Sequence, residues 1–283
     1  MNKLKNTIKA ILIRLQPKTV IQLQVAQLAP NALLKDRCAL ITGGSSGIGL
    51  AIAEAFLKSG ANVVITGRSI EKLNKATEEL SAYGKCCGIV MDVTKAETLQ
   101  RDFELAVSKF GRIDILVNNA GVSGATIANA TPEEFDKVID TNLKGVFFLS
   151  QLVGKYMIKN DVHGNILNIS SASSIRPAAC AYTISKWGVR GFTMGLARTL
   201  LPYDIVVNAL APGPTATPLL NKGDDCNDYA LPRTPSGRYA SPIEIANMAV
   251  VLVSDMARLI VGDTVFMTGG AGNINNGDID YPI

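Results

Sequence analysis

The sequence has little histidine and few cysteines. Its only histidine, His163, stands in a turn-like Asp-Val-His-Gly stretch with no partner nearby, which argues against a histidine-based catalytic triad or zinc site. Its five cysteines are odd in number, lack the spacing of metal ligands and accompany no recognisable secretory signal. We therefore expect reduced thiols, a cytoplasmic location and no bound metal.

Long apolar runs, internal repeats and low-complexity segments are also missing. No stretch approaches the ~18 residues that a membrane-spanning helix needs. With 283 residues, of which 47% are hydrophobic, the chain can instead bury a large core. These features predict one large soluble α/β domain with short appendages.

Acidic residues are absent from the first 35 positions, which carry six of the 28 basic residues. The other residues hold 22 basic and 24 acidic side chains, a net charge of −2, which argues against a broad nucleic-acid surface. We divide the chain into an N-terminal extension (1–35), a main domain (36–270) and an Asn-, Gly- and Asp-rich tail (271–283) that we expect to be loop or disordered.

Within the extension, apolar residues recur at helical spacing over residues 1–16, with basic residues on the other faces. Such a helix suits a peripheral contact with an anionic membrane surface or a contact with another subunit. The alternative is a helix that packs on its own domain or frays.

In the main domain, apolar segments of strand length alternate with helical patterns. The strand candidates are 38–42, 62–66, 88–92, 113–118, 165–170, 205–210 and 264–268, and the helix candidates are 47–59, 70–82, 95–110, 132–159, 182–200 and 242–254. Seven strands in βα alternation predict a Rossmann-type, doubly wound parallel sheet with helices on both faces. Its ligand is expected beyond the carboxyl ends of the strands, where the strand order reverses.

Residues 42–49, Thr-Gly-Gly-Ser-Ser-Gly-Ile-Gly, join the first strand candidate to the first helix. A glycine turn there lets backbone N–H groups approach a pyrophosphate, and the helix N-terminus adds a favourable field for the anion. The alternative is an ordinary glycine-rich turn. The candidate dinucleotide-binding residues are Gly43, Ser45, Ser46, Gly47, Ile48 and Gly49.

Arg68 follows the second strand candidate, where NAD-preferring sites usually carry an Asp or Glu. An acid would repel a 2′-phosphate, whereas a guanidinium can bind phosphate through two hydrogen bonds. The position favours NADP(H). The alternatives are NAD(H) and an arginine that is only a solvated loop residue.

Tyr182 and Lys186 lie four positions apart at the start of a helix candidate, and therefore on one helical face. A phenol with a pKa near ~10 is a poor acid or base at neutral pH, and lowering it by about three units requires roughly 4 kcal/mol of preferential stabilisation of the phenolate. A lysine cation and the helix N-terminus are suitable sources. The pattern predicts a general acid/base at Tyr182.

The spacing Gly43-x3-Gly47-x-Gly49, the Asn-Asn-Ala-Gly stretch at 118–121 and the Tyr182-x3-Lys186 pair occur in one order along the chain. Together they resemble the TGxxxGxG, NNAG and YxxxK motifs of the short-chain dehydrogenase/reductase family. The resemblance covers residues 36–270. It implies an NAD(P)-dependent oxidoreductase, with a homotetramer or homodimer built on the helices that hold Asn142 and Tyr182.

The resemblance also implies roles for four catalytic residues. Tyr182 would exchange a proton with the substrate oxygen, Ser171 would hydrogen-bond that oxygen, Lys186 would bind the nicotinamide ribose and lower the tyrosine pKa, and Asn142 would anchor a proton-relay water. Ser171 lies eleven positions before Tyr182, whereas the family usually has about thirteen. Ser170 and Ser173 therefore remain alternatives for the catalytic serine.

Further cofactor contacts follow from the same resemblance. Asp92 would hold the adenine amino group, and the Thr215 backbone with the Thr217 hydroxyl would hold the nicotinamide carboxamide. The remaining implied contacts are Val93, Asn119, Ala120, Gly121, Pro212 and Gly213.

We thus expect an NADP(H)-dependent oxidoreductase that moves a hydride between nicotinamide and a small-molecule carbonyl or secondary alcohol, without a metal. The alternatives are an NAD-dependent dehydrogenase of the same family and a non-catalytic NADP-binding regulator. Residues 219–238 are polar and rich in Gly and Pro, which predicts a mobile lid that selects the substrate. No chemical signature in that segment identifies the substrate.

Overall fold

The computed structural model describes residues 31–220 and 228–272, which form one parallel sheet in the order β3-β2-β1-β4-β5-β6-β7. The strands are β1 (Cys38–Thr42), β2 (Asn62–Gly67), β3 (Cys86–Val90), β4 (Ile115–Asn118), β5 (Asn165–Ile169), β6 (Val206–Pro212) and β7 (Thr264–Met267). The order reverses between β1 and β4. The expected doubly wound sheet of seven strands is confirmed.

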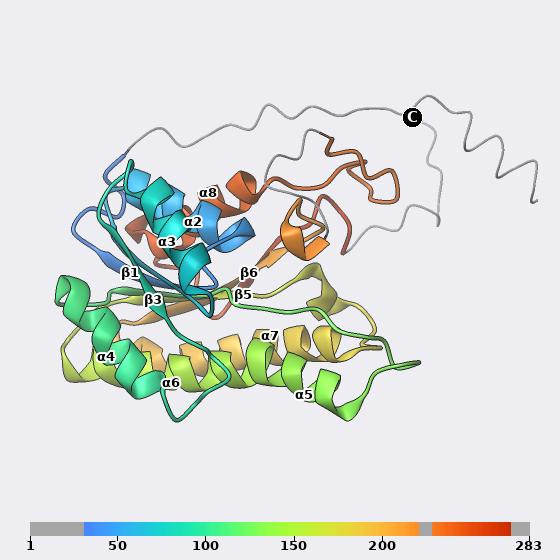
Figure 1. Ribbon diagram of the computed structural model, residues 1–283, viewed down its shortest axis with the longest axis horizontal. Helices are drawn as coiled ribbons and strands as arrows, with labels where there is room; N and C mark the ends of the chain where they lie inside the picture. The colour runs from blue at the N-terminus through green and yellow to red at the C-terminus, as the bar shows by residue number, and fades with distance from the viewer. Residues whose placement is uncertain (1–30, 221–227, 273–283) are drawn as a thin grey trace, which may run out of the picture.

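Helices cover both faces of the sheet (Figure 1). On one face lie α2 (Gly47–Lys58), α3 (Ile70–Leu80) and α8 (Pro242–Val253), and on the other lie α4 (Leu99–Phe110), α5 (Pro132–Ile139), α6 (Gly145–Lys159) and α7 (Ala181–Leu200). Short 3-10 segments are η2 (Ala172–Ile175), η3 (Leu201–Tyr203), η4 (Pro218–Leu220) and η5 (Asp255–Ala257).

Alternate residues of each central strand feed two separate apolar layers. In β1, Ala39 and Ile41 pack in the layer under α2 and α8, whereas Cys38 and Leu40 pack in the layer against α4, α6 and α7. A strand buried on both faces needs apolar residues at every position. This is why the strands appear in the sequence as continuous apolar runs. Because all the strand pairs are parallel, their carboxyl ends emerge together at one edge of the sheet.

The helical pattern over 132–159 is not one continuous helix. A π-helical turn, η1 (Asp140–Lys144), separates α5 from α6, and Asn142 lies within it. A π-turn widens the helix by one residue per turn and occurs often at functional sites. Local periodicity over a long stretch does not reveal a single widened turn, so the sequence predicted one helix.

Several predicted boundaries were also displaced, among them those of β3 and α4. β3 begins at Cys86 and ends at Val90, two residues before the predicted 88–92, because its pairing with β2 runs from Val63↔Cys86 to Gly67↔Val90. α4 begins at Leu99 because residues 92–98 form two successive turns, with Lys95 N donating to Asp92 O and Thr98 N to Lys95 O, both at 3.0 Å. Pairing partners, not the apolar run, decide where each element starts.

The described residues begin inside the segment assigned to the extension. Leu34 is fully buried in the core beneath α2, and its amide donates to Ser59 O at 2.9 Å. The helix expected over residues 1–16 lies outside the described residues, as does the tail from residue 273. Within the described ranges, no helix has the length and apolar character needed to span a membrane.

Candidate active site

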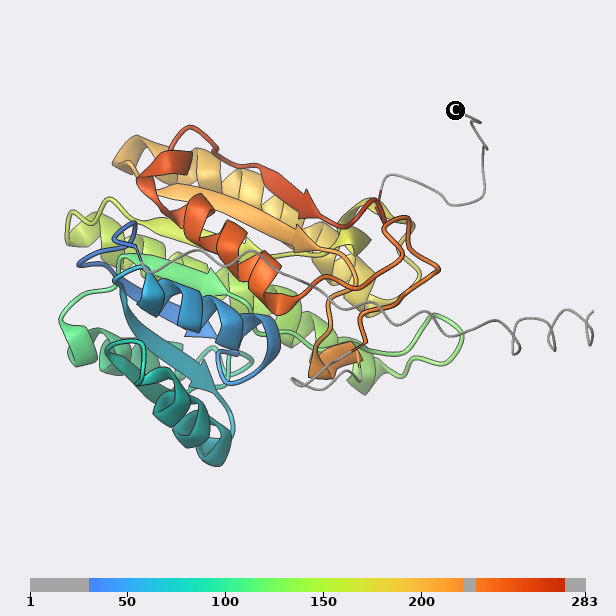
Figure 2. The same cartoon turned by 90° about the horizontal axis from the view of Figure 1, so that it is seen from above.

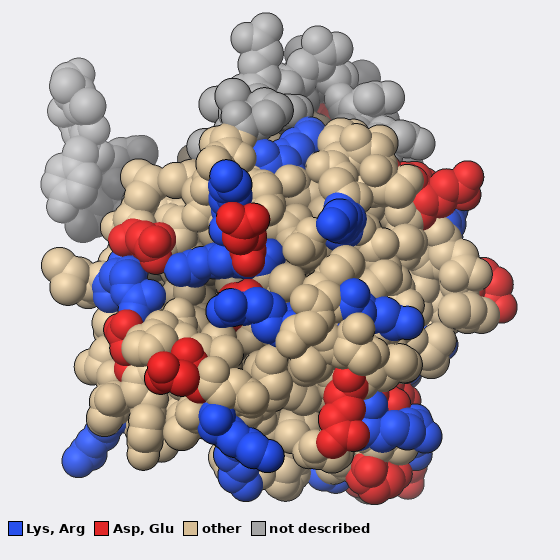
Figure 3. All heavy atoms as spheres, turned by 90° about the vertical axis from the view of Figure 1, so that its left-hand side faces the viewer, with Lys and Arg blue, Asp and Glu red and all other residues tan. Residues whose placement is uncertain are grey.

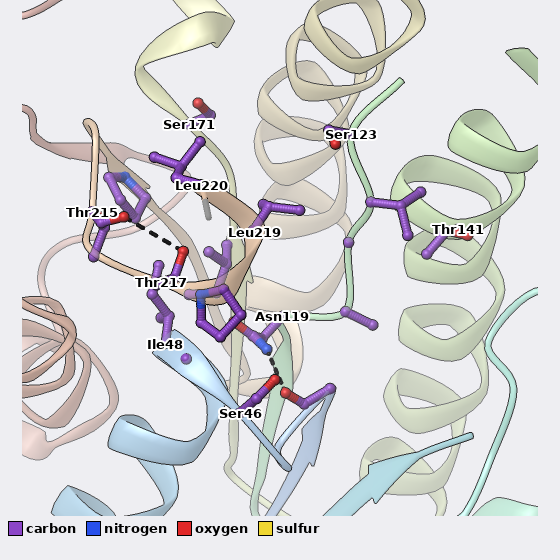
Figure 4. Close-up of a pocket in the computed structure, with 18 of the residues that line it drawn as sticks. Ser46, Ile48, Asn119, Ser123, Thr141, Ser171, Thr215, Thr217, Leu219 and Leu220 are labelled. Carbon is purple, nitrogen blue, oxygen red and sulfur yellow. Dashed lines mark hydrogen bonds between the residues drawn. The ribbon is translucent and has the colours of Figure 1, made fainter. Parts of the chain in front are cut away.

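A cavity of about 640 Å³ opens beyond the carboxyl ends of the strands. It lies at the switch point between β1 and β4, where the strand order reverses. In Figure 4, Ser46 and Ile48 come from the start of α2, Thr215 and Thr217 from the segment after β6, and Ser171 from the end of β5. The residues assigned from the sequence all line this cavity except Gly49 and Asn142, which lie behind its wall.

The glycine turn after β1 brings backbone, not side chains, to the cavity. Gly43 and Gly47 adopt φ of 64° and 55°, a region that favours glycine. A Cβ on Gly49 would lie 2.3 Å from Gly43 O and 2.4 Å from Asn119 Nδ2, so only glycine lets α2 pack this closely. The N-cap Ser46 makes no side-chain capping bond, which leaves the first N–H groups of α2 available to an anion. The turn fits a dinucleotide pyrophosphate.

Thr42 and Asn119 join the glycine turn to the end of β4. Thr42 Oγ1 accepts hydrogen bonds from the amides of Asn119 and Ala120, both at 3.0 Å. Asn119 Nδ2 donates to Thr42 O at 2.9 Å and to Gly43 O at 3.1 Å, and Figure 4 shows the second of these bonds. These bonds hold the loop after β1 and the loop after β4 at a fixed distance from each other. Sequence reasoning assigned Asn119 as a cofactor contact, but it gave Thr42, the first residue of the 42–49 stretch, no role of its own.

The far end of the cavity, beyond β2 and β3, carries the cations. Arg68 follows Gly67, and Lys72 in the first turn of α3 lines the same space. Asp92 is the acid there, and its Oδ1 accepts from Thr94 N at 3.0 Å and Thr94 Oγ1 at 2.8 Å. Lys72 was not assigned from the sequence, although a basic residue one helical turn past Arg68 was a readable signal.

Tyr182 and Lys186 meet in the middle of the cavity. Lys186 Nζ lies 5.7 Å from the centroid of the Tyr182 ring and donates to Ile169 O at 2.7 Å. Lys186 is buried, with 5% of its surface exposed. The first two turns of α7 present both side chains on one face, as their four-residue spacing predicted.

The electrostatics of this pair differ from the sequence-based expectation. Burial raises the pKa of Tyr182 above its ordinary value, and a hydrogen bond with Ser171 lowers it by less. Burial also lowers the pKa of Lys186 to about 8. A group removed from water loses the hydration that stabilises its charged form, and this desolvation is the largest effect on the pKa of both side chains. The Tyr182 phenol therefore carries its proton at neutral pH.

Ser171 is the serine whose hydroxyl contacts Tyr182. Its Oγ also accepts from Ser173 N at 3.1 Å, which holds the hydroxyl beside Tyr182 at the cavity wall. Ser170 is buried, and its Oγ instead donates to Lys186 O at 3.3 Å. The geometry favours Ser171 over Ser170 and Ser173.

Asn142 acts on the cavity wall from behind. Its Oδ1 accepts from Val122 N at 2.8 Å, and its Nδ2 donates to Val122 O at 2.9 Å and to Ser185 Oγ at 3.2 Å. Ser185 in turn donates to Tyr182 O at 2.6 Å. This completely buried amide connects the loop after β4 to the turn of α7 that carries Tyr182, and Ser185 was not assigned from the sequence.

The segment after β6 closes the cavity on the side opposite Asn119. Thr215 Oγ1 donates to Gly213 O at 3.0 Å and Thr217 Oγ1 to Thr215 O at 3.4 Å, so both threonines are held facing inward (Figure 4). A Cβ on Gly213 would lie 2.8 Å from Thr268. Leu219 and Leu220, the first residues of the predicted lid, extend this wall. Of the predicted lid over 219–238, residues 221–227 lie outside the described ranges.

The fold and the site together define an NAD(P)-dependent oxidoreductase, and comparisons with known proteins agree. Residues 43–272 match a family model described as Enoyl-(Acyl carrier protein) reductase. The chain is 39% identical over 242 residues to 3-oxoacyl-(acyl-carrier-protein) reductase of Thermotoga maritima, covering 84% of this chain and 98% of that one. It is 38% identical over 246 residues to a 3alpha-hydroxysteroid dehydrogenase of Mediterraneibacter gnavus, with 84% and 98% coverage.

Solved structures lead to the same group. A 3-oxoacyl-(acyl-carrier protein) reductase from Brucella melitensis superposes with a TM-score of 0.81 at 31% identity, covering 91% of this chain and 100% of that one. A 3-ketoacyl-(acyl-carrier-protein) reductase from the same organism, complexed with NADH, gives 0.76 at 32% identity, with 84% and 99% coverage. The chain belongs to the short-chain dehydrogenase/reductase family.

Proposed function

We propose that this protein is an NADP(H)-dependent reductase of carbonyl compounds, with Tyr182 as the general acid. The observation that carries the proposal is the presence of Tyr182, Ser171 and Lys186 in one cavity with the glycine turn. The names of the relatives, which include reductases of 3-oxoacyl thioesters and a hydroxysteroid dehydrogenase, support a carbonyl or secondary alcohol as the reacting group.

Each residue has a part that follows from its contacts. The nicotinamide cofactor, when bound along the glycine turn, supplies or accepts the hydride. Ser171 donates a hydrogen bond to the carbonyl oxygen, and Tyr182 gives that oxygen a proton. Lys186, held by Ile169 O, places a cation at the ribose side of the site. Asn142 keeps the loop after β4 and the first turn of α7 in register.

The protonation states support the reductive direction. A phenol whose pKa is raised by burial carries its proton at neutral pH and can give it to a developing alkoxide. Reduction of a carbonyl needs such a donor, whereas alcohol oxidation needs a base.

The function is tested by following NADPH absorbance with a panel of ketones, aldehydes and 3-oxoacyl thioesters. We expect turnover of at least one class by the wild-type chain. A wild type that binds NADPH but is inert across the whole panel would favour the alternative of a non-catalytic regulator.

Cofactor choice rests on Arg68 and Lys72. We expect Arg68→Gln to weaken NADPH binding by about ten-fold and to change NADH binding little, because a guanidinium hydrogen-bonded to phosphate contributes more than a neutral contact. Fluorescence titration of both cofactors measures this. Arg101→Gln on α4, which removes an exposed arginine outside the cavity, is the control. Equal losses for the two cofactors would show that Arg68 makes no contact with a 2′-phosphate.

We also propose that the chain forms a homodimer or homotetramer through α6 and α7. Large apolar side chains are exposed on these helices: Phe147, Phe148, Ile184, Trp187 and Met194. Phe147 contacts the Phe148 and Phe192 rings at centroid distances of 5.2 and 5.0 Å, which makes a ready-packed apolar face. Sedimentation equilibrium should give two or four chains per particle; a stable monomer at micromolar concentration would contradict the proposal.

Other expectations remain predictions. The cytoplasmic location inferred from the cysteines, and a membrane or subunit contact through residues 1–16, belong to this group. Figure 3 shows basic and acidic side chains interspersed over the face at the left of Figure 1, so this face offers no broad basic surface. The expectation that nucleic acid is not a partner also stays a prediction.

A further inference from the structure

Arg176 is an isolated charge at the substrate end of the cavity. Residues 121–131, 165–185 and 212–220 contain no Asp, Glu, Lys or Arg other than Arg176. These three segments line the cavity around Ser171 and Tyr182. The charged groups elsewhere in the cavity lining are Arg68, Lys72 and Asp92 at the adenosine end, and the buried Lys186.

The backbone of Arg176 is anchored at two atoms. Its amide donates to Ser173 O at 3.3 Å, and its carbonyl accepts from Trp187 Nε1 at 2.8 Å. Trp187 lies one helical position past Lys186, and Arg190 lies 5.8 Å from the Trp187 ring. The residue is thus positioned from the same helix that carries Tyr182.

The neighbouring loop is attached to the loop of Arg176. Thr126 and Cys180 form an isolated antiparallel bridge, and Ile127 N donates to Ala179 O at 2.9 Å. The two loops together form the substrate side of the cavity, where Ser123 and Ser173 add hydroxyl groups. In the described part of the chain, the guanidinium of Arg176 has no recorded hydrogen bond or ion pair, and the residue is exposed.

Arg176 is too far along the sheet to serve the adenosine end. It follows β5, whereas Arg68 follows β2, and β1 and β4 lie between. Three strand spacings amount to about 14 Å. The Arg176 guanidinium therefore lies on the same side of the cavity as Ser171 and Tyr182, where it faces a substrate whose carbonyl reaches these two residues.

We propose that Arg176 binds an anionic group of the substrate, a carboxylate or a phosphate, and so selects carbonyl compounds that carry one. The planar guanidinium offers two parallel N–H donors that match either anion, and its fixed backbone limits the ordering cost. This inference rests on the proposed function, because it names the class of substrate that the reductase takes.

The test compares matched pairs of carbonyl compounds with NADPH. The carboxylate arm is 4-oxopentanoate against its methyl ester, and the phosphate arm is dihydroxyacetone phosphate against dihydroxyacetone. We expect the wild type to prefer one anion over its neutral partner in kcat/KM by about 30-fold, and Arg176→Gln to abolish that ratio. Arg176→Lys should keep part of it, since the charge remains but the fork is lost. Arg101→Gln should keep it whole.

Binding supplies a second readout that does not need turnover. In Tyr182→Phe saturated with NADPH, the change in nicotinamide fluorescence reports binding of the same four compounds. We expect the preferred anion to bind more tightly than its neutral partner, and this difference to disappear in the Tyr182→Phe, Arg176→Gln double variant.

The outcomes distinguish a failure of the Arg176 proposal from a failure of the proposed reductase function. If the wild type reduces neutral and anionic partners equally well, or Arg176→Gln lowers both equally, the reductase stands and the role of Arg176 is refuted. If none of the compounds is reduced, the fluorescence arm decides: an Arg176-dependent preference for the anion supports the site, and equal binding of each pair refutes it.

Discussion

Replacing Tyr182 with phenylalanine is expected to lower kcat/KM for carbonyl reduction by about 1,000-fold, within the usual range for a general acid. Burial raises the pKa of the Tyr182 phenol, which lies beside Ser171 and so keeps its proton at neutral pH. Lys186 Nζ lies 5.7 Å from the centroid of the Tyr182 ring. Phenylalanine keeps the ring and loses only the hydroxyl. The Kd for NADPH, measured by fluorescence, should therefore stay within about three-fold, since a hydroxyl contributes at most one neutral hydrogen bond to the cofactor.

Tyr156 provides the matched control. It lies half-buried on α6, edge-on to Phe103 with ring centroids 5.2 Å apart, and outside the cavity lining. Tyr156→Phe should keep both kcat/KM and NADPH affinity. A Tyr182→Phe protein that retains more than a tenth of wild-type activity would assign the proton to another donor, with Ser171 the first to test.

Replacing Lys186 with methionine is expected to reduce activity by about 100-fold and, at neutral pH, to stabilise the fold. The loss follows from removal of the cation beside Tyr182 and of its bond to Ile169 O. The gain follows from burial, which lowers the pKa of Lys186 from 10.5 to about 8. That difference corresponds to about 3 kcal/mol of unfavourable desolvation in the charged form, of which about 1 kcal/mol is offset in the variant by the lost hydrogen bond.

The pH dependence has a definite sign. Below pH 8 the folded and unfolded chains both hold the Lys186 proton, and the desolvation cost is fully present. Between about 8 and 10.5 the unfolded chain binds more protons than the folded one, so wild-type stability rises with pH relative to the methionine variant. Urea unfolding at pH 7 and pH 10 should show the advantage of Lys186→Met shrinking by about 2 to 3 kcal/mol.

Lys155→Met on α6 controls for removal of an exposed ammonium, because Lys155 lies on the surface away from the cavity. The stability difference between Lys186→Met and wild type should shrink with pH, while Lys155→Met should not reproduce that trend. A difference that stays constant from pH 7 to pH 10 would mean that Lys186 does not carry a buried charge in the folded protein.

Much of this molecule is encoded in local pattern. Continuous apolar runs such as 38–42 and 165–169 predicted strands buried on both faces, because the helices between them must cover both sides of a parallel sheet. The spacing of Gly43, Gly47 and Gly49 predicted the turn. Gly43 and Gly47 adopt positive φ, and the close packing at Gly49 leaves no room for a Cβ. A four-residue spacing placed Tyr182 and Lys186 on one face, because the α-helical period guarantees it.

The remaining features depend on contacts between segments far apart in the chain, which no local pattern records. The pairing of β2 with β3 set where β3 begins, and the bonds of Asn142 to Val122 and Ser185 accompany a π-turn that periodicity concealed. Burial raises the pKa of Tyr182, whereas the sequence argument counted only groups that lower it, because desolvation is a property of the assembled cavity and not of the Tyr-x3-Lys motif. Sequence thus determined which elements form and which chemical groups they carry, while tertiary packing decided their distances, their exposure to water and so their charge.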